Sequence, residues 1–179
     1  MIRKGIWILA LVSLSSLAWQ CSNNELDREK ARIAKLEKQF FDANPAPDPE
    51  SLITGESLLA AYIDYAARVK DSIMAPEYLF KAAELALGLN KAQQSLELFN
   101  RIIYQYPAYE RVPESLFLMG FIYENNLQNF GKAKEIYERF IQRYPDHEFA
   151  DDAAISIQNL GKTPEELVRE FEQKNQVDL

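Results

Sequence analysis

The second half of the chain repeats itself without a gap, so that residues 76–114 match the stretch that follows them. When residues 76–114 are shifted by 38, seven positions are identical, whereas chance would give roughly two for ordinary composition. These pairs are Leu89/Leu127, Glu97/Glu135, Arg101/Arg139, Ile103/Ile141, Tyr106/Tyr144, Pro107/Pro145 and Glu110/Glu148. A repeat of this length is one supersecondary unit used several times, each unit burying its apolar face on the next. Such arrays are usually surfaces that hold other proteins.

Each clear repeat is predicted to be a pair of helices, because apolar residues recur three or four positions apart in two successive runs. In the repeat at 76–107 the buried stripes are expected to be Leu79, Phe80, Ala82, Ala83, Ala86 and Leu87, then Leu96, Phe99, Ile102 and Ile103. In the repeat at 114–145 they are expected to be Phe117, Leu118, Gly120, Phe121, Tyr123, Ala133, Ile136, Tyr137, Phe140 and Ile141. Pro107 and Pro145 end the second helices, because proline cannot donate to the preceding turn.

An amphipathic helix is predicted at residues 25–41, where Leu26, Ile33 and Phe40 are seven apart on a charged background. One interpretation is a helix that packs on the first repeat. The other is a short coiled coil through which copies of the chain associate. The prolines of the following segment, Asn44 to Pro49, break the helix and give a stiff connection.

The next segment, residues 49–75, is predicted to hold the helix of a degenerate repeat, running from Pro49 to about Lys70. Its Ser-Leu pair at 57–58 matches the pair at 95–96 with the same spacing of 38. Gly55 is expected to be a weak point in this helix.

A third copy of the first repeat helix is predicted at residues 149–160, with Gly161 as its C-cap. The sequence Thr163-Pro164-Glu165-Glu166 is a capping box with proline at the first helical position, and it predicts a last helix to about Lys174. The predicted organisation is a leader at 1–20, a tether, helix and proline-rich linker at 21–48, a degenerate repeat helix at 49–75, repeats at 76–161, and a C-terminal capping helix and tail at 162–179.

Residues 1–20 have the three-part pattern of a secretory signal peptide: basic residues, an apolar run from Ile6 to Val12, and then small residues. The run is shorter than the roughly 20 apolar residues that a membrane-spanning helix needs. Loss of this segment, which contains Arg3 and Lys4, would change the net charge from −7 to −9.

Cys21 follows the apolar run at the position where a bacterial lipoprotein is cleaved and acylated, and it is the only cysteine in the sequence. A polar segment comes directly after it and would serve as a tether. Cleavage after Ala18 by ordinary signal peptidase is the alternative, because residues 16–18 follow the small-x-small rule. We expect lipid attachment at Cys21.

The composition speaks against an enzyme. One histidine and one cysteine exclude most metal clusters and nucleophile–base pairs, and no cofactor or metal site is expected. His147 is interpreted as a solvated turn residue, and the pair Asp151 and Asp152 as charges that suit a helix start. With a net charge of −7 and no basic block, nucleic acid is not an expected partner.

The second clear repeat resembles the small-large-small-large-proline series of tetratricopeptide repeats (TPR), and the first copy follows it more loosely. The residues expected to carry this packing are Ala83, Phe99, Pro107, Gly120, Tyr123, Ala133, Tyr137 and Pro145. Small residues let helix backbones approach, and large ones fill the holes beside them. The resemblance implies an all-α fold, a right-handed solenoid of helical hairpins (a TPR-type α–α superhelix) with about two clear repeats and degenerate flanking helices.

In repeats of this family the first helix of each pair usually forms the inner wall of a groove that receives peptides or helices. Four residues lie on or beside these helices and are therefore the candidate partner-binding residues: Tyr78, Lys81, Asn125 and Asn126.

The repeat is longer than the usual period of about 34 residues, and its Tyr-Pro with a polar turn is similar to that of bacterial envelope members of the family. These include BamD-like outer-membrane assembly lipoproteins and the TPR domains of Tol–Pal cell-division coordinators. With the leader and Cys21, the chain resembles small TPR lipoproteins of Bacteroidetes-type envelopes.

The resemblance implies an exported, non-enzymatic scaffold, lipid-anchored at the periplasmic face of the outer membrane, that binds envelope proteins such as subunits of the β-barrel assembly machinery. Two other functions fit the same sequence: a cell-division coordinator of the Tol–Pal type, and a structural envelope protein that self-associates through residues 25–41. A soluble periplasmic location and display at the cell surface are the alternatives to the anchored periplasmic one.

Overall fold

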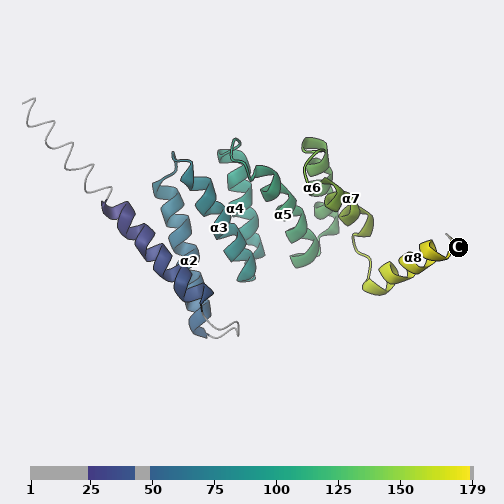
Figure 1. Ribbon diagram of the computed structural model, residues 1–179, viewed down its shortest axis with the longest axis horizontal. Coiled ribbons are helices and arrows are strands. Elements are labelled where there is room, and N and C mark those ends of the chain that lie inside the picture. Colours follow the sequence, from purple (N-terminus) through teal and green to yellow (C-terminus); the bar gives the residue numbers. More distant parts are fainter. Residues whose placement is uncertain (1–23, 43–48, 178–179) are drawn as a thin grey trace, which may run out of the picture. The chain divides into compact units, whose positions relative to one another are not determined.

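The computed structural model describes residues 24–42 and 49–177, and within these ranges every regular element is a helix (Figure 1). The first helix occupies residues 24–41. The others are α2 (Pro49–Arg68), α3 (Met74–Gly88), α4 (Ala92–Gln105), α5 (Val112–Phe121), the π-helical turn η1 (Ile122–Asn126), α6 (Phe130–Arg143), α7 (Ala150–Asn159) and α8 (Pro164–Val177). The predicted all-α class is confirmed. The predicted leader, Cys21 and the prolines at 45 and 47 lie outside the described residues.

The chain divides into two compact units, with the boundary after Tyr78. The described part of the first unit consists of the helix of residues 24–41, α2 and the start of α3. The second unit contains the rest of α3 and all later helices. Each unit is described below by itself.

In the first unit the helix of residues 24–41 packs on α2 as an antiparallel hairpin. Glu25, near its start, pairs with Arg68 at the end of α2, and Glu37, near its end, accepts a hydrogen bond of 2.7 Å from Tyr62 Oη. Ile33 lies between these contacts and is buried. Residues 25–41 therefore pack on the helix that follows them, and association of copies through this helix stays a prediction.

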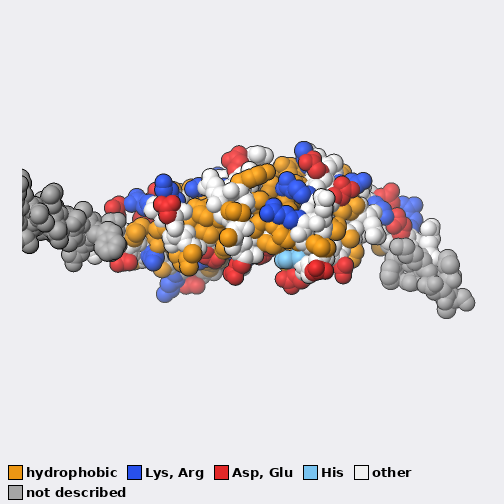
Figure 2. Space-filling model, turned by 90° about the horizontal axis from the view of Figure 1, so that it is seen from above, with side chains coloured by type: hydrophobic (Ala, Val, Ile, Leu, Met, Phe, Trp, Pro, Cys, Tyr) orange, Lys and Arg blue, Asp and Glu red, His pale blue; other side chains and the backbone are white. Residues whose placement is uncertain are grey.

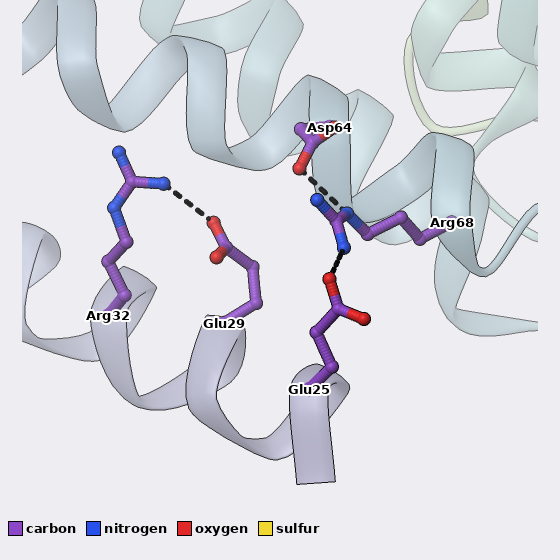
Figure 3. Close-up of polar contacts among 5 residues, drawn as sticks. All are labelled: Glu25, Glu29, Arg32, Asp64 and Arg68. Carbon is purple, nitrogen blue, oxygen red and sulfur yellow. Dashed lines mark hydrogen bonds and ion pairs between the residues drawn. The ribbon is translucent and has the colours of Figure 1, made fainter. Parts of the chain in front are cut away.

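An ion-pair network closes one end of this hairpin (Figure 3). The Arg68 guanidinium reaches from α2 to Glu25 of the first helix and to Asp64 of its own helix, with 2.8 Å between Nε and Asp64 Oδ2. Both carboxylates raise the pKa of Arg68, chiefly through the hydrogen bond that its guanidinium donates to Glu25. All three side chains are exposed, so the network contributes little to the free energy of unfolding. Its main effect is to hold the two helices in their antiparallel arrangement.

The second unit begins with the hairpin of α3 and α4, which is held by small and aromatic residues. The rings of Phe80 and Phe99 meet edge to face at 5.3 Å. Ser95 Oγ donates a buried hydrogen bond of 2.8 Å to the carbonyl oxygen of Ala83. Since all four residues are fully buried, this contact is the core of the first repeat.

The hairpin of α5 and α6 repeats this arrangement with a closer contact. A Cβ on Gly120 would lie 2.6 Å from Cε1 of Tyr137, a distance that real Cβ atoms do not show. Phe117 of α5 lies 5.6 Å from both Tyr137 and Phe140 of α6, measured between ring centroids. The predicted role of Gly120 as the site of close helix approach is confirmed.

The helices begin at the same register in successive repeats. Met74, Val112 and Ala150 begin α3, α5 and α7, and the same interval of 38 separates their positions. Ala92 and Phe130 begin α4 and α6 with the same spacing. The helices α4 and α6 end two residues before Pro107 and Pro145, because the residue before a proline is pushed out of the helical conformation.

One predicted core residue of the second repeat is wrong. Phe121 is 41% exposed, and the buried residues of this helix are Val112, Ser115, Leu116, Met119 and Gly120, followed by Ile122 of η1. At about 100° per residue, the stripe through Leu116, Met119 and Gly120 leaves position 121 on the outer side of the helix. Most residues of α5 are apolar, so its composition alone does not distinguish this outward position from the buried ones.

The interpretation of His147 as a solvated turn residue is also corrected. Its ring is partly buried and lies 5.5 Å from Phe140 and 5.3 Å from Phe149. Its Nδ1 accepts a hydrogen bond of 3.2 Å from the backbone N–H of Phe149. His147 therefore packs the turn between α6 and α7, because an imidazole can fill an aromatic cluster and satisfy a backbone donor at once.

Candidate partner-binding surface

The structure places the four candidate residues on two elements. Tyr78 and Lys81 lie on α3, both partly buried, and Asn125 and Asn126 lie next to each other in η1, both exposed. Within the first unit, the Tyr78 ring contacts those of Tyr62 and Tyr65, at 5.9 Å and 4.4 Å. Tyr78 therefore contributes to packing there. Each pair therefore lies within one element: Tyr78 and Lys81 are one helical turn apart on α3, and the two asparagines are consecutive in η1.

Exposed apolar side chains flank the turn η1 of the second repeat. Phe121 precedes it, and Leu127 and Phe130 follow it; all three are exposed large apolar residues. Together with Asn125 and Asn126 they form what we call the η1 surface. Figure 2 shows hydrophobic side chains reaching the surface between charged ones in this molecule. Exposed aromatic and aliphatic side chains beside amide groups are the usual composition of a protein-binding patch.

The backbone of η1 explains why these side chains are exposed. The N–H of Leu127 donates to the carbonyl of Ile122 at 3.1 Å, five residues back, which widens the last turn. The Asn125 side chain donates to the carbonyl of Phe121 at 3.1 Å, and Asn129 Oδ1 caps α6 by accepting from the N–H of Lys132. Such π-helical turns are frequent at functional sites.

One side chain of η1 points to the core instead. Glu124 accepts a hydrogen bond of 2.8 Å from the hydroxyl of Tyr137, whose ring is fully buried. Burial raises the pKa of Tyr137, the bond to Glu124 raises it further, and a bond with Ser156 opposes them. Tyr137 therefore stays neutral and joins η1 to α6, so its role is to fix the η1 surface in place.

Another contact, that of Arg111, joins the first repeat to the second. The Arg111 guanidinium lies 3.4 Å above the centroid of the Phe80 ring. It donates two hydrogen bonds, of 2.7 Å and 2.8 Å, to the carboxylate of Glu114. Glu84 of α3 lies 3.9 Å from the same guanidinium. Glu114 contributes most to raising the pKa of Arg111, and burial opposes it. This cation joins α3 to the start of α5.

Metal-binding side chains are not clustered in the described part of the chain. Within the described ranges no group of three or more histidine, cysteine, aspartate or glutamate side chains could hold a metal ion. Every buried side-chain nitrogen and oxygen in the described part has a partner. None of the described helices is long and apolar enough to cross a membrane. The features that the structure does show are packed hairpins and an exposed apolar surface.

The fold and its packing define a helical-repeat protein. Residues 77–109 and 114–147 each match the tetratricopeptide repeat, in register with the two hairpins described above. No curated protein matches the chain. Two stretches of the chain thus match the tetratricopeptide repeat, which supports the resemblance drawn from the sequence at the level of the repeat. Repeats of this class typically form non-catalytic scaffolds for protein–protein interaction.

The η1 surface was only half anticipated from the sequence. Asn125 and Asn126 were predicted from their place beside a first helix. The predicted core includes Phe121, and the predicted partner-binding residues do not include Leu127 or Phe130. A helical-wheel plot of α5 would have put Phe121 outside the stripe that contains Leu116 and Gly120.

Proposed function

We propose that this chain is a scaffold that binds a protein of the cell envelope through its two tetratricopeptide repeats. The observation that carries the proposal is the η1 surface, where Phe121, Leu127 and Phe130 are exposed beside a packed repeat. Burial of apolar area is the dominant favourable term in most protein–protein association. The partner therefore carries an apolar face that covers these three side chains.

The place of action in this proposal is the periplasmic face of the outer membrane. It is supported by the three-part leader at residues 1–20. It is also supported by Cys21, because a lipoprotein is acylated on a cysteine at this position. Stable anchoring needs more than one acyl chain, and bacterial lipoproteins satisfy that condition. Mass spectrometry of the mature N-terminus tests this point: an acylated Cys21 supports the anchor, and an N-terminus at Trp19 contradicts it.

The partner class that we propose is a subunit of the outer-membrane β-barrel assembly machinery, by similarity to BamD-like lipoproteins. Depletion of the chain tests this assignment directly. Loss of many barrel proteins from the outer membrane is the expected result. A septation defect with normal barrel proteins would contradict it and would point to a division coordinator.

Binding through the η1 surface is tested by crosslinking in membranes followed by purification of the chain. A stoichiometric partner is expected with the unaltered chain and with Tyr104→Glu, a control at a side chain that is 70% exposed on α4. The double variant Phe121→Glu with Leu127→Glu should lose that partner. Equal recovery with both variants would remove the η1 surface from the proposal.

A further inference from the structure

The third repeat of the second unit lacks its second helix at the expected register. The helix α7 begins at Ala150 and so keeps the interval of 38 from Val112. A partner of the kind formed by α4 and α6 would begin at position 168, at the same interval from Phe130. The chain has α8 there instead, and α8 begins four residues early, at Pro164. The helix α8 is therefore the sequence equivalent of the missing second helix.

The surface of α7 that this second helix would cover is open. Leu79, Phe117 and Ile155 occupy the same register in α3, α5 and α7. Leu79 is buried, and Phe117 packs on Tyr137 and Phe140 of the second helix of its own repeat. Ile155, in contrast, is 54% exposed. Its exposure follows from the absence of a covering helix.

The helix α8 has an apolar face of its own that is also uncovered. Leu167 is 37% exposed and Val168 is 56% exposed. The predicted role of residues 162–179 as a cap on the last repeat is thus not fulfilled by these two side chains. One chain therefore carries two complementary uncovered faces, Ile155 on α7 and the Leu167–Val168 pair on α8.

The connection between α7 and α8 differs from the two connections that close the complete repeats. In those, Asn90 and Gln128 occupy equivalent positions of the repeat and have a left-handed backbone, with φ of 59° and 48°. In the third connection the left-handed residue is Gly161, φ 75°, directly after the extended C-cap Leu160, φ −50° and ψ 123°. The chain reversal that brings the second helix back is therefore replaced by a different turn.

Local contacts hold the third connection in this form. A Cβ on Gly161 would lie 3.4 Å from Cδ2 of Phe130, so the turn is seated against a ring of α6. Lys162 donates its N–H to the carbonyl of Asn159 at 3.0 Å and pairs its ammonium with Glu170 of α8 at 2.7 Å. Folding α8 back over Ile155 of its own chain would have to change the turn that the contact with Phe130 and the bond from Lys162 to Asn159 hold in place.

We propose that two copies of the chain exchange their last helices, so that the Leu167–Val168 face of α8 from one copy packs on Ile155 of α7 in the other. A second copy fits because it offers both missing faces at once and closes as a two-fold dimer. The helices pack antiparallel, because both first turns are acidic (Asp151 and Asp152 in α7, Glu165 and Glu166 in α8) and a parallel pair would bring these charges together.

Disulfide trapping tests the exchange. Cys21 is the only cysteine, so Cys21→Ser gives a thiol-free background that also prevents acylation. The full chain with Ile155→Cys is mixed with the full chain with Val168→Cys under mild oxidation. A covalent heterodimer is expected, and mixing Tyr104→Cys with Val168→Cys should give at least tenfold less. Equal yields in the two mixtures would overturn the proposal.

The double variant Ile155→Cys with Val168→Cys separates exchange from closure within one chain. Exchange predicts dimers linked between chains, whereas a disulfide within single chains that persists on dilution would overturn the proposal.

Light scattering of the Cys21→Ser chain measures its mass in solution and tests the exchange independently. We expect twice the monomer mass, with Ile155→Glu weakening association at least tenfold and Tyr104→Glu leaving it unchanged. A monomer at about 100 µM, or a dimer that Ile155→Glu does not weaken, would contradict the exchange.

Discussion

Gly120 and Tyr137 are in closer contact than any larger residue at position 120 would permit. A Cβ on Gly120 would lie 2.6 Å from Cε1 and 2.7 Å from Cδ1 of a ring that has no exposed surface. The same positions in the preceding repeat hold Ala82 and Phe99, both fully buried. The second repeat has the larger ring, Tyr137 in place of Phe99, and the smaller residue opposite it, Gly120 in place of Ala82. The two differences compensate in volume.

Replacement of Gly120 by alanine should destabilise the second unit. The added methyl group must displace a buried ring, which costs about 1–3 kcal/mol and outweighs the gain of up to about 1 kcal/mol from helix propensity. Chemical denaturation followed by circular dichroism measures the effect. Gly88→Ala is the matched control: nothing lies within 4 Å of its Cβ position, so this variant should be neutral or slightly stabilised. Equal effects of the two substitutions would show that helix approach at Gly120 is not tight.

The bond between Tyr137 and Glu124 predicts a loss of stability in alkaline solution. The pKa of Tyr137 is raised in the folded chain above its ordinary value of 10.0, chiefly by burial. Its contribution is therefore fully present below about pH 10 and is lost as pH rises, because only the unfolded chain releases this proton. The slope is about 1.4 kcal/mol per pH unit. Denaturation between pH 9 and 12 should show a smaller slope for Tyr137→Phe, by about that amount.

Tyr104→Phe is the control for this pH dependence. The Tyr104 ring is exposed, so its hydroxyl is in water in both the folded and unfolded chains. We expect the same slope as in the unaltered chain. A slope that decreases equally in both variants would mean that the Tyr137 hydroxyl is not held neutral by its surroundings.

Replacement of Arg111 by lysine should weaken the contact between successive repeats although the charge is kept. The guanidinium stacks on Phe80 and forks onto Glu114, and an ammonium can do neither with the same geometry. We expect a loss of about 1–2 kcal/mol in the free energy of unfolding of the second unit. Arg101→Lys, on α4, is the matched control and should change stability by less than about 0.5 kcal/mol. An unchanged Arg111→Lys variant would show that the planar group is not what joins α3 to α5.

The capping box at the start of α8 gives a local prediction. The hydroxyl of Thr163 accepts from the N–H of Glu166 at 3.2 Å, and the Glu166 carboxylate accepts from the N–H of Thr163 at 2.8 Å. Thr163→Ala should destabilise this helix by about 1 kcal/mol and increase hydrogen exchange in its first turns. Thr54→Ala removes only a bond from a hydroxyl to the carbonyl of Glu50 within α2, and there exchange should not increase.

The repeat itself could be predicted from the sequence because its evidence is local and periodic. Gly120, Ala133, Tyr137 and Phe140 are buried as expected, and the helices start at the register that the sequence repeat predicts. Gly161 has a positive φ, but it lies in the turn directly after the C-cap, which is Leu160 and not Gly161 as predicted. The capping box that begins with Thr163 forms as predicted. Each of these features depends on spacing within one or two helical turns, which a single sequence records.

The features that were missed depend on tertiary packing. The π-helical turn follows from how α5 meets its neighbours, which apolar composition does not reveal. His147 packs because Phe140 and Phe149, from either side of a turn, happen to meet it. The candidates Tyr78 and Lys81 were chosen by their place on a helix, and partner binding by them stays a prediction.

Site-specific photocrosslinking in cells that naturally make the chain tests the scaffold proposal most directly. A photoreactive residue is placed singly at each candidate position (Tyr78, Lys81, Asn125, Asn126), at Phe121 and Leu127 of the η1 surface, and at the exposed control positions Glu97 and Glu138 on α4 and α6. We predict one discrete adduct of the same envelope protein from the η1 positions and none from the two controls. Absence of any adduct at the η1 positions, or the same adducts at both sets, would contradict the claim that this surface holds a specific partner.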